Sequence, residues 1–249
     1  MMRAVFKMEM IKNLQDKGLY FWTFVLPVIF TVLFISIFTA GTEGADKEYV
    51  IISIVPGYTV MFVFFIIISM GFSFIEDRNK GMIARIASTP LSSFGYLIGK
   101  WVPYIMIVLI QIVVLLTFGK IVYNVPIEQP LLLGTLALVL TLCITGIGLA
   151  ISLFIPTGNM GVAITQVIAL GGALLGGLWM PFEALPTLFQ KIGKITPQYW
   201  AHEAFQDAMK GTLSHSDFLV AILILLSFCF VGFTVAMIMY PYFLKRAKN

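Results

Sequence analysis

The placement of charged residues constrains this 249-residue chain more than any other feature. Only 11% of the residues are charged and 59% are hydrophobic, whereas soluble domains carry about 25% charged residues. No charged residue lies between Glu128 and Glu183. So few charges cannot cover the surface of a soluble domain, and a disordered chain would be poor in large apolar residues. The sequence therefore predicts a multi-pass membrane protein.

Six stretches without charged residues are long enough to span a bilayer, because a crossing helix needs about 20 mainly apolar residues. The interval from Glu128 to Glu183 is too long for one crossing, and Pro-Thr-Gly-Asn at 156–159 is expected to form a tight turn near its middle. We expect an all-α membrane protein in which residues 1–249 form a single transmembrane domain. The predicted spans are residues 21–40, 50–75, 101–118, 131–155, 162–180 and 218–244.

Lysine and arginine are shared unevenly between the two sides of the predicted bundle. Eleven of the sixteen fall in the N-terminal segment, in the loop after the second span and in the C-terminal tail, which lie on one side. The positive-inside rule therefore predicts that both termini are cytoplasmic. The first span is expected to be retained as a signal anchor, because its apolar stretch exceeds that of a signal peptide and no cleavage motif follows.

The segment before the first span can form an amphipathic helix over residues 2–18. Arg3 and Lys7 lie at the apolar edge, where long basic side chains can reach the headgroups. We expect an N-terminal interfacial helix, with an irregular lead-in as the alternative. The apolar side carries Phe6, Met10, Ile11 and Leu14, and the opposite side carries Glu9, Lys12, Asn13 and Asp16.

The charged segment after the second span predicts a short cytoplasmic helix that ends at Thr89-Pro90. At about 100° per residue, Met82, Ile83 and Ile86 share one face. Asp77, Arg78, Arg85 and Ser88 share the other. Two interpretations remain open. The helix is either a solvated connector on the headgroups or a docking element with its charged face toward a partner.

The segment from Pro181 to Asp217 predicts two short amphipathic helices on the outer side. Tyr199 and Trp200 lie between them, as interfacial aromatic residues do. We expect interfacial or partly re-entrant helices rather than a separate external domain. Their apolar faces carry Leu185, Leu188, Phe189 and Ile192 in the first, and Ala201, Phe205 and Met209 in the second.

Metal-binding and catalytic patterns are missing from the sequence. Cys143 and Cys229 lie in apolar stretches, which predicts neither a disulfide nor a zinc site. His202 and His215 are expected to be solvated or helix-capping residues, so no metal site is predicted. No Ser–His or paired-carboxylate arrangement supports a membrane-embedded enzyme. The predicted spans also lack acids and histidines, which disfavours an ion-coupled carrier.

A nucleotide-binding motif is also missing. The segment from Gly95 to Lys100 resembles a phosphate loop but has three residues between its glycines instead of four. Trp101 stands where that loop needs a serine or threonine for Mg²⁺. Energy for transport would therefore come from another chain, and this chain is expected to bind no cofactor and no nucleic acid.

Two blocks of residues carry a family resemblance over essentially the whole chain. The first contains Glu76, Asp77, Arg78, Gly81, Arg85, Thr89, Pro90, Tyr96, Gly99 and Lys100. The second runs from Gly176 to Pro186 and continues with Pro197 and Tyr199. With six spans, these blocks resemble the ABC-2 type permeases, the membrane subunits of one class of ATP-driven exporter.

The resemblance implies roles for both blocks. The first would form the coupling helix that docks in a cleft of the ATPase subunit, with residues Glu76, Asp77, Arg78, Gly81, Met82, Ile83, Arg85, Ile86, Thr89 and Pro90. The second would form external helices that dip back into the membrane, with Gly176, Gly177, Pro181, Glu183, Pro186, Pro197 and Tyr199.

The resemblance also implies partners. Two permease subunits, identical or different, would pair above two cytoplasmic ABC ATPase subunits that bind ATP and Mg²⁺, in contact with membrane lipid. Gly172 and Gly176 form a GxxxG motif that permits close helix packing, either between subunits or within one.

We therefore expect a permease in a bacterial-type cell membrane that exports an amphipathic drug, antibiotic or lipopeptide, because its predicted spans carry no charge. The alternatives are a polysaccharide, teichoic-acid or lipid exporter of the same architecture, and a membrane immunity or binding protein that transports nothing.

Overall fold

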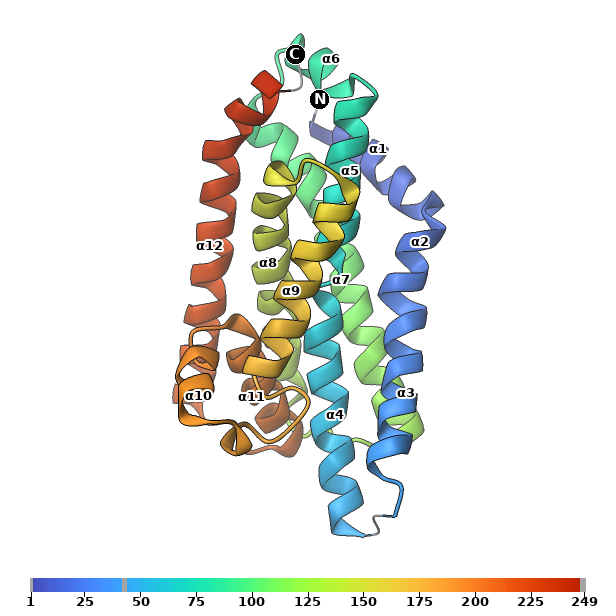
Figure 1. Ribbon diagram of the computed structural model, residues 1–249, viewed down its shortest axis with the longest axis vertical. Coiled ribbons are helices and arrows are strands. Elements are labelled where there is room, and N and C mark those ends of the chain that lie inside the picture. The colour runs from blue at the N-terminus through green and yellow to red at the C-terminus, as the bar shows by residue number, and fades with distance from the viewer. Residues whose placement is uncertain (1, 42–43, 247–249) are drawn as a thin grey trace.

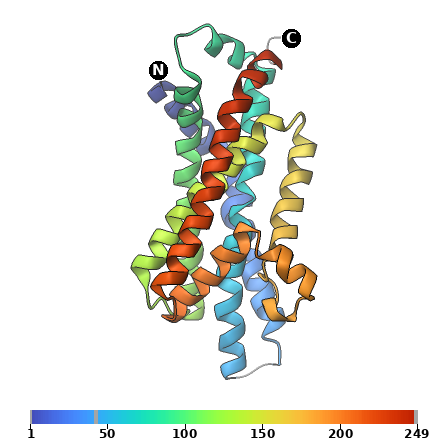
Figure 2. The ribbon, with the colours of Figure 1, turned by 90° about the vertical axis from the view of Figure 1, so that its left-hand side faces the viewer.

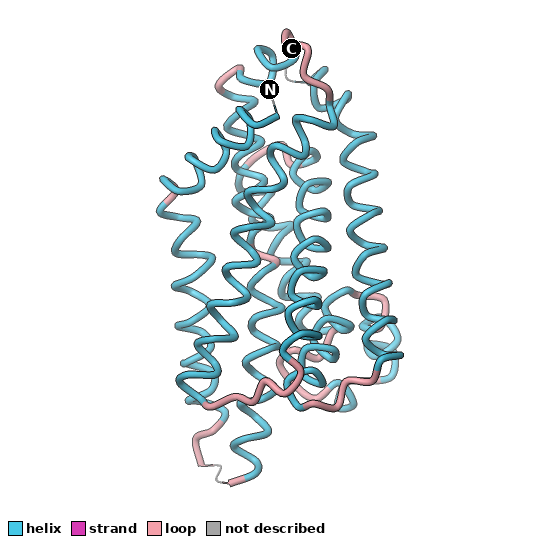
Figure 3. The backbone as a smooth tube through the Cα atoms, turned by 180° about the vertical axis from the view of Figure 1, so that it is seen from behind, coloured by secondary structure: helices cyan, strands magenta, loops and turns pink. Residues whose placement is uncertain are grey.

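The computed structural model describes residues 2–41 and 44–246, and all regular structure in these ranges is helical (Figure 3). Six segments of them are long and apolar enough to cross a membrane, which confirms the predicted number of spans. They are Lys17–Phe38, Val50–Asn79, Ser93–Tyr123, Pro130–Phe154, Gly158–Leu175 and His215–Lys245. Both ends of the chain lie at the same end of the bundle as the short helix α6 (Met82–Ala87), called here the α6 end (Figure 1).

The N-terminal helix is divided where the sequence predicted one continuous helix over residues 2–18. Helix α1 (Met2–Gln15) stops before Asp16, whose Oδ1 accepts a hydrogen bond from the Leu19 amide at 3.1 Å and caps α2 (Lys17–Tyr20). A π-helical turn, η1 (Phe21–Val25), and α3 (Leu26–Phe38) complete the first span. The cap at Asp16 therefore marks the point where the chain changes direction into the span.

The second span forms the centre of the core. It consists of α4 (Ala45–Val63) and α5 (Ile66–Asn79), which are separated by a break at Phe64 and Phe65. After α6, helix α7 (Ser93–Tyr123) begins where the Ser92 hydroxyl accepts a hydrogen bond from the Gly95 amide at 3.1 Å. Because α7 starts well before the apolar stretch 101–118, Lys100 lies inside this helix and not in a loop.

The last three spans close the bundle. Helices α8 (Pro130–Phe154) and α9 (Gly158–Leu175) are joined by a short turn at the predicted position. Helix α12 (His215–Arg246) runs along α8 and crosses it obliquely (Figure 2). The crossing is close at Gly232, where an added Cβ would lie 2.6 Å from the Gly146 backbone. Backbone-to-backbone packing of this kind requires glycine on both helices.

Short helices lie at the opposite end of the bundle, beside the ends of α8, α9 and α12 (Figure 1). A 3₁₀ turn, η2 (Phe182–Ala184), leads into α10 (Thr187–Gly193) and α11 (Pro197–Lys210). Ala201, Phe205 and Met209 of α11 are fully buried, on the face that the sequence pattern predicts as apolar. Helix α11 packs on α4, α8, α9 and α12, so it is part of the core.

Candidate functional site

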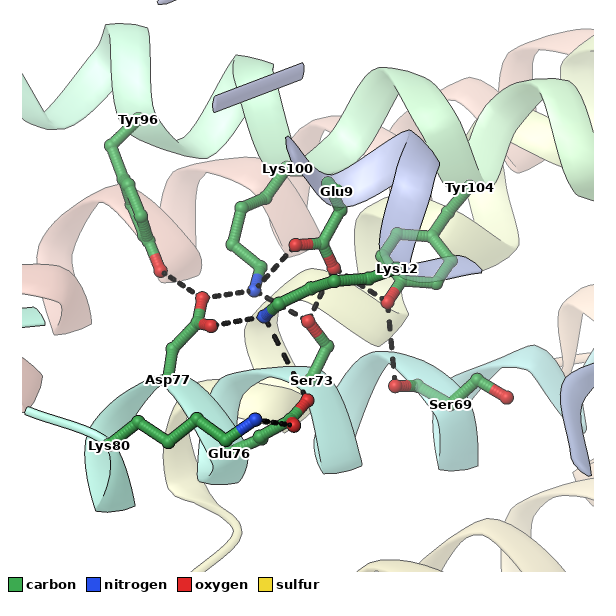
Figure 4. Close-up of polar contacts among 10 residues, drawn as sticks. All are labelled: Glu9, Lys12, Ser69, Ser73, Glu76, Asp77, Lys80, Tyr96, Lys100 and Tyr104. Carbon is green, nitrogen blue, oxygen red and sulfur yellow. Dashed lines mark hydrogen bonds and ion pairs between the residues drawn. The ribbon is translucent and has the colours of Figure 1, made fainter. Parts of the chain in front are cut away.

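An ionic cluster links three helices at the α6 end (Figure 4). The Lys100 ammonium of α7 lies 2.6 Å from Asp77 Oδ2 of α5. It also lies 3.1 Å from Glu9 Oε2 of α1, as an ion pair rather than an aligned hydrogen bond. All three side chains are fully buried. The two acids would be costly to bury without this cation.

A second lysine balances the charge of the cluster. Lys12 of α1 pairs with Asp77 Oδ1, and its Nζ lies 3.9 Å from Glu76 Oε2. Burial by itself lowers the pKa of Lys12, but the hydrogen bond and charge of Asp77, with the nearby acids Glu9 and Glu76, outweigh it and raise this pKa above its ordinary value. Lys12 therefore stays charged, and the cluster contains two buried acids and two lysines.

Hydroxyl groups satisfy the remaining oxygens of the cluster. Tyr104 donates a hydrogen bond of 2.9 Å to Glu9 Oε1, which also accepts one from Ser73. Lys100 donates to the Ser73 hydroxyl at 2.6 Å, and Tyr96 donates to Asp77 Oδ2 at 3.4 Å. The cluster is therefore a connected network of side chains from α1, α5 and α7, and it holds the N-terminal helix against the bundle.

Asp77 was expected on a charged face with Arg78 and Arg85, and the structure corrects this. Residues 76–88 do not form one helix: α5 ends at Asn79, and Gly81 has a left-handed backbone with φ of 64° before α6 begins. A single helical projection therefore does not apply across Gly81. Asp77 belongs to the last turn of α5 and points into the protein, where it is fully buried.

The expectation that the spans carry no charge is also wrong. Counting uninterrupted apolar stretches places every charge outside them, but the helices extend past these stretches and include Asp77 and Lys100. Glu9 and Asn13 were assigned to the polar side of the N-terminal helix. That side faces the bundle, while Ile11 and Leu14 on the apolar side are exposed.

Other residues of the first block lie around α6. Ile83 is buried, Met82 and Ile86 are partly buried, and Arg85, Thr89 and Pro90 are exposed. Helix α6 thus rests on α5 and α12 through its apolar side and presents Arg85 to solvent. The Arg78 guanidinium donates a hydrogen bond of 2.7 Å to the Pro156 carbonyl, and Glu76 pairs with Lys80 at 2.5 Å on the surface. The end of α5 therefore also contacts the turn between α8 and α9.

Residues of the second block lie at the opposite end. Gly176 ends α9 and Gly177 has φ of 71°, so the chain turns sharply here. Pro181, Glu183 and Pro186 are exposed around η2. Pro197 begins α11, and the Tyr199 ring centroid lies 4.4 Å from that of Phe182.

The two glycines of the GxxxG motif contact α11 of the same chain. A Cβ on Gly172 would lie 2.1 Å from Gln198 Nε2, and one on Gly176 would lie 3.0 Å from the Tyr199 nitrogen. Gln198 is buried and donates a hydrogen bond of 3.1 Å to the Ile168 carbonyl. The small residues therefore allow α11 to approach α9 closely.

His202 is buried, which corrects the expectation of a solvated or capping residue. Its side chain is 2% exposed, and Nε2 lies 3.4 Å from the Ser53 carbonyl of α4 and 3.1 Å from Gln206 Nε2. Gln206 also donates a hydrogen bond of 2.9 Å to the Ser53 hydroxyl. The three residues join α11 to α4. Burial lowers the pKa of His202 to about 4.

This lowered pKa predicts an acid-dependent loss of stability. An unfolded histidine takes up a proton near pH 6.5, whereas folded His202 stays neutral down to about pH 4. This stability is complete above about pH 6.5 and is lost as the pH falls toward 4. The loss amounts to about 2 kcal/mol at pH 5. Thermal unfolding in detergent should therefore show a larger drop from pH 8 to pH 5 for the wild type than for His202→Gln. Equal drops would contradict this assignment.

Comparison with known proteins agrees with these features. The family model described as ABC-2 type transporter matches residues 2–210. The chain is 26% identical over 211 residues to YvfS of Bacillus subtilis, named as a transport permease, with 82% of this chain and 83% of that protein aligned. It is 22% identical to the B. subtilis linearmycin resistance permease protein LnrN, over 79% of this chain and 50% of that protein.

A third relative is YbhR of Escherichia coli, named as a multidrug ABC transporter permease. It is 27% identical over 61% of this chain and 40% of its own length. The chain therefore spans half or less of the length of LnrN and YbhR. The chain is a multi-pass permease of the cell membrane without ATPase activity of its own, and its family implies pairing with an ABC ATPase subunit. The match over most of its length shows that the chain belongs to the ABC-2 type transporter family.

Proposed function

We propose that this permease exports an amphipathic compound, such as a drug, antibiotic or lipopeptide, with ATP and Mg²⁺ bound by a separate ATPase subunit. The names of two relatives, a linearmycin resistance permease and a multidrug transporter permease, support this class of substrate. The lysine and arginine distribution supports a cytoplasmic location for the α6 end and both termini. The substrate would leave toward the side of α10 and α11.

The observation that carries the proposal is the position of α6. This helix is held on the bundle by buried Ile83 and exposes Arg85, as a docking element requires. It follows α5 after only two residues, and α5 carries Asp77 in its last turn. In our proposal, a shift of α6 on the ATPase moves the end of α5, and the ionic cluster transmits this movement to α1 and α7.

The remaining first-block residues have distinct parts in this proposal. Gly81 permits the turn between α5 and α6, and Thr89 with Pro90 ends the docking segment. Glu76 and Arg78 flank the docking surface, whereas buried Asp77 acts inside the protein. On the opposite side, α10 and α11 would form the re-entrant external helices. A second permease copy or a related chain would complete the transport path.

The docking role predicts the effect of reversing one charge. Arg85→Glu should reduce the amount of ATPase subunit that co-purifies with the tagged permease from its native host by at least about tenfold, because like charges at an interface oppose binding. ATP-driven export should fall in parallel, while the amount of permease in the membrane stays unchanged.

The matched control is Arg3→Glu, the same charge reversal at an exposed position of α1 at the same end. This variant should retain the ATPase subunit. Normal export and normal ATPase recovery with Arg85→Glu would contradict the docking role. A wild-type eluate free of any ATPase would instead favour a membrane binding protein that transports nothing.

A further inference from the structure

A groove with apolar and polar lining runs beside the first span. It lies between α2–η1 and α5 at the α6 end and has a volume of about 550 Å³. Its walls include Leu19 and Ile68, which are buried, and Trp22 and Phe72, which are 39% and 48% exposed. The groove is therefore apolar in its depth, and two large aromatic side chains stand at its accessible surface.

The groove continues into a polar part of about 440 Å³ that reaches α1. The two parts share Asp16, Ser69, Phe72, Glu76 and Lys80, so they form one space. The polar part is also lined by Lys12 and Asn13. Along α5 and the residue that follows it, the lining changes from Ile68 and Phe72 to Glu76 and Lys80 toward the α6 end. This order of polarity is that of a lipid in the adjacent leaflet, with its chains inward and its headgroup outward.

One polar atom of this space lacks a partner. Asn13 is 6% exposed, and its amide Nδ2 is buried without a hydrogen-bond acceptor among the described residues. Native proteins rarely leave a buried donor unpaired. An acceptor oxygen of a bound molecule would satisfy it, and a phosphate would also be attracted by Lys12 and Lys80.

The charges in the groove have both signs. Lys12 and Lys80 are accompanied by Asp16 and Glu76. Asp16 caps α2 with one oxygen and has no ion pair within the residues that the structure describes. A ligand with an anionic group alone would be repelled by the two carboxylates. A zwitterion with a phosphate and a primary ammonium group matches both signs.

We propose that this groove binds one phosphatidylethanolamine molecule from the leaflet at the α6 end. Its phosphate lies near Asn13 and Lys80, its ammonium group near Asp16, and an acyl chain along Trp22 and Ile68. This lipid is a bound component of the permease and not its exported substrate. The assignment needs neither an ATPase partner nor a direction of transport.

Native mass spectrometry of the purified, delipidated protein in detergent tests the proposal. Phosphatidylethanolamine should form a one-to-one adduct at a lower concentration than phosphatidylglycerol or phosphatidylcholine with the same acyl chains. Asn13→Ala should weaken this adduct about tenfold through loss of one hydrogen bond to a charged group. Asn159→Ala is the matched control, because it makes the same change at an exposed residue in the first turn of α9 at the same end.

Two further variants distinguish recognition of the lipid headgroup from occupancy of the groove. Asp16→Asn keeps an oxygen to cap α2 but removes the charge, and should abolish the preference over phosphatidylcholine. Ser69→Phe should fill the groove and remove the adduct. Because Asn13 Nδ2 has no partner to lose, Asn13→Ala should keep the elution volume and melting temperature of the lipid-free protein.

Several results would overturn the assignment. Equal binding of the three lipids would show that the groove does not recognise the headgroup. If soluble glycerophosphoethanolamine formed the adduct at the same concentration as phosphatidylethanolamine, the acyl chain would not be bound. A wild-type dimer that lacks lipid and dissociates with Ser69→Phe would show that a second copy of the chain fills the groove.

Discussion

Replacing Lys100 with methionine is expected to destabilise the permease severely. Lys100 is the buried cation between Glu9 and Asp77, and its removal leaves two buried carboxylates with too little positive charge. Loss of one partner from a buried ion pair costs about 3–5 kcal/mol. We expect little monodisperse protein on size exclusion in detergent and a melting temperature well below that of the wild type.

The matched control is Lys120→Met, which makes the same change at an exposed position of α7 and should leave the melting temperature unchanged. The double variant Lys100→Met with Asp77→Asn should be more stable than Lys100→Met alone, because it removes one of the unpaired charges. If the effects of the two substitutions simply add, the proposed coupling between Lys100 and Asp77 is refuted.

Gly232→Ala should separate α12 from α8. An added Cβ would lie 2.6 Å from the Gly146 backbone, and a backbone atom cannot move aside as the end of a side chain can. Overpacking of a well-packed core costs about 1–3 kcal/mol, and this contact lacks a flexible neighbour that could relieve it. The melting temperature should fall, with a further fall for Gly232→Val.

Two other glycines complete a graded series. Gly146→Ala should be milder, since its Cβ would lie 3.0 Å from the nearest atom, the Cys229 carbonyl oxygen. Gly134→Ala in α8 has open space around the new Cβ and should be neutral or slightly stabilising, because alanine favours a helix over glycine. A series in which all three variants have equal stability would contradict the close crossing at Gly232.

Hydropathy was sufficient to predict the number of spans, because each span must bury about 20 apolar residues in the bilayer. It did not predict how far the helices extend beyond the apolar stretches. The tight turn between α8 and α9 followed from proline, glycine and asparagine within an otherwise apolar stretch. Two helices at the opposite end followed from their 3.6-residue periodicity. In α11 the predicted apolar face is buried at Ala201, Phe205 and Met209, whereas Leu188, Phe189 and Ile192 of α10 are exposed. These features depend on the local sequence and on whether a segment lies in lipid or in water.

The ionic cluster could not be predicted by the same means. Glu9, Asp77 and Lys100 are far apart in the sequence. Glu9 falls on the polar side of the predicted N-terminal helix, and Asp77 and Lys100 look like ordinary charges near the end of an apolar stretch. Only the packing of α1 against α7 and α5 brings them together. One local signal was available: Ser73 and Asp77 are four residues apart, as are Glu9 and Asn13, so each pair lies on one helix face.

His202 shows a similar limit. Its neighbours Glu203 and Asp207 suggested a solvated helix, but the position lies on the inner face of α11 with Phe205 and Met209. Its partner Ser53 comes from α4, 149 residues earlier in the chain. A helical projection of α11 with a wider apolar face would have placed His202 inside, but it would not have identified Ser53.

The division of the ionic cluster among three helices has a consequence for biogenesis. The ribosome makes the acids Glu9 and Asp77 before it makes Lys100, because the chain reaches α7 only after the first two spans. While the third span is missing, Lys12 is the cation of the cluster that is present with both acids. Because α1 packs on α7, the N-terminal helix can complete its docking only after α7 enters the membrane. We therefore expect the N-terminal helix to remain undocked until the third span has been made.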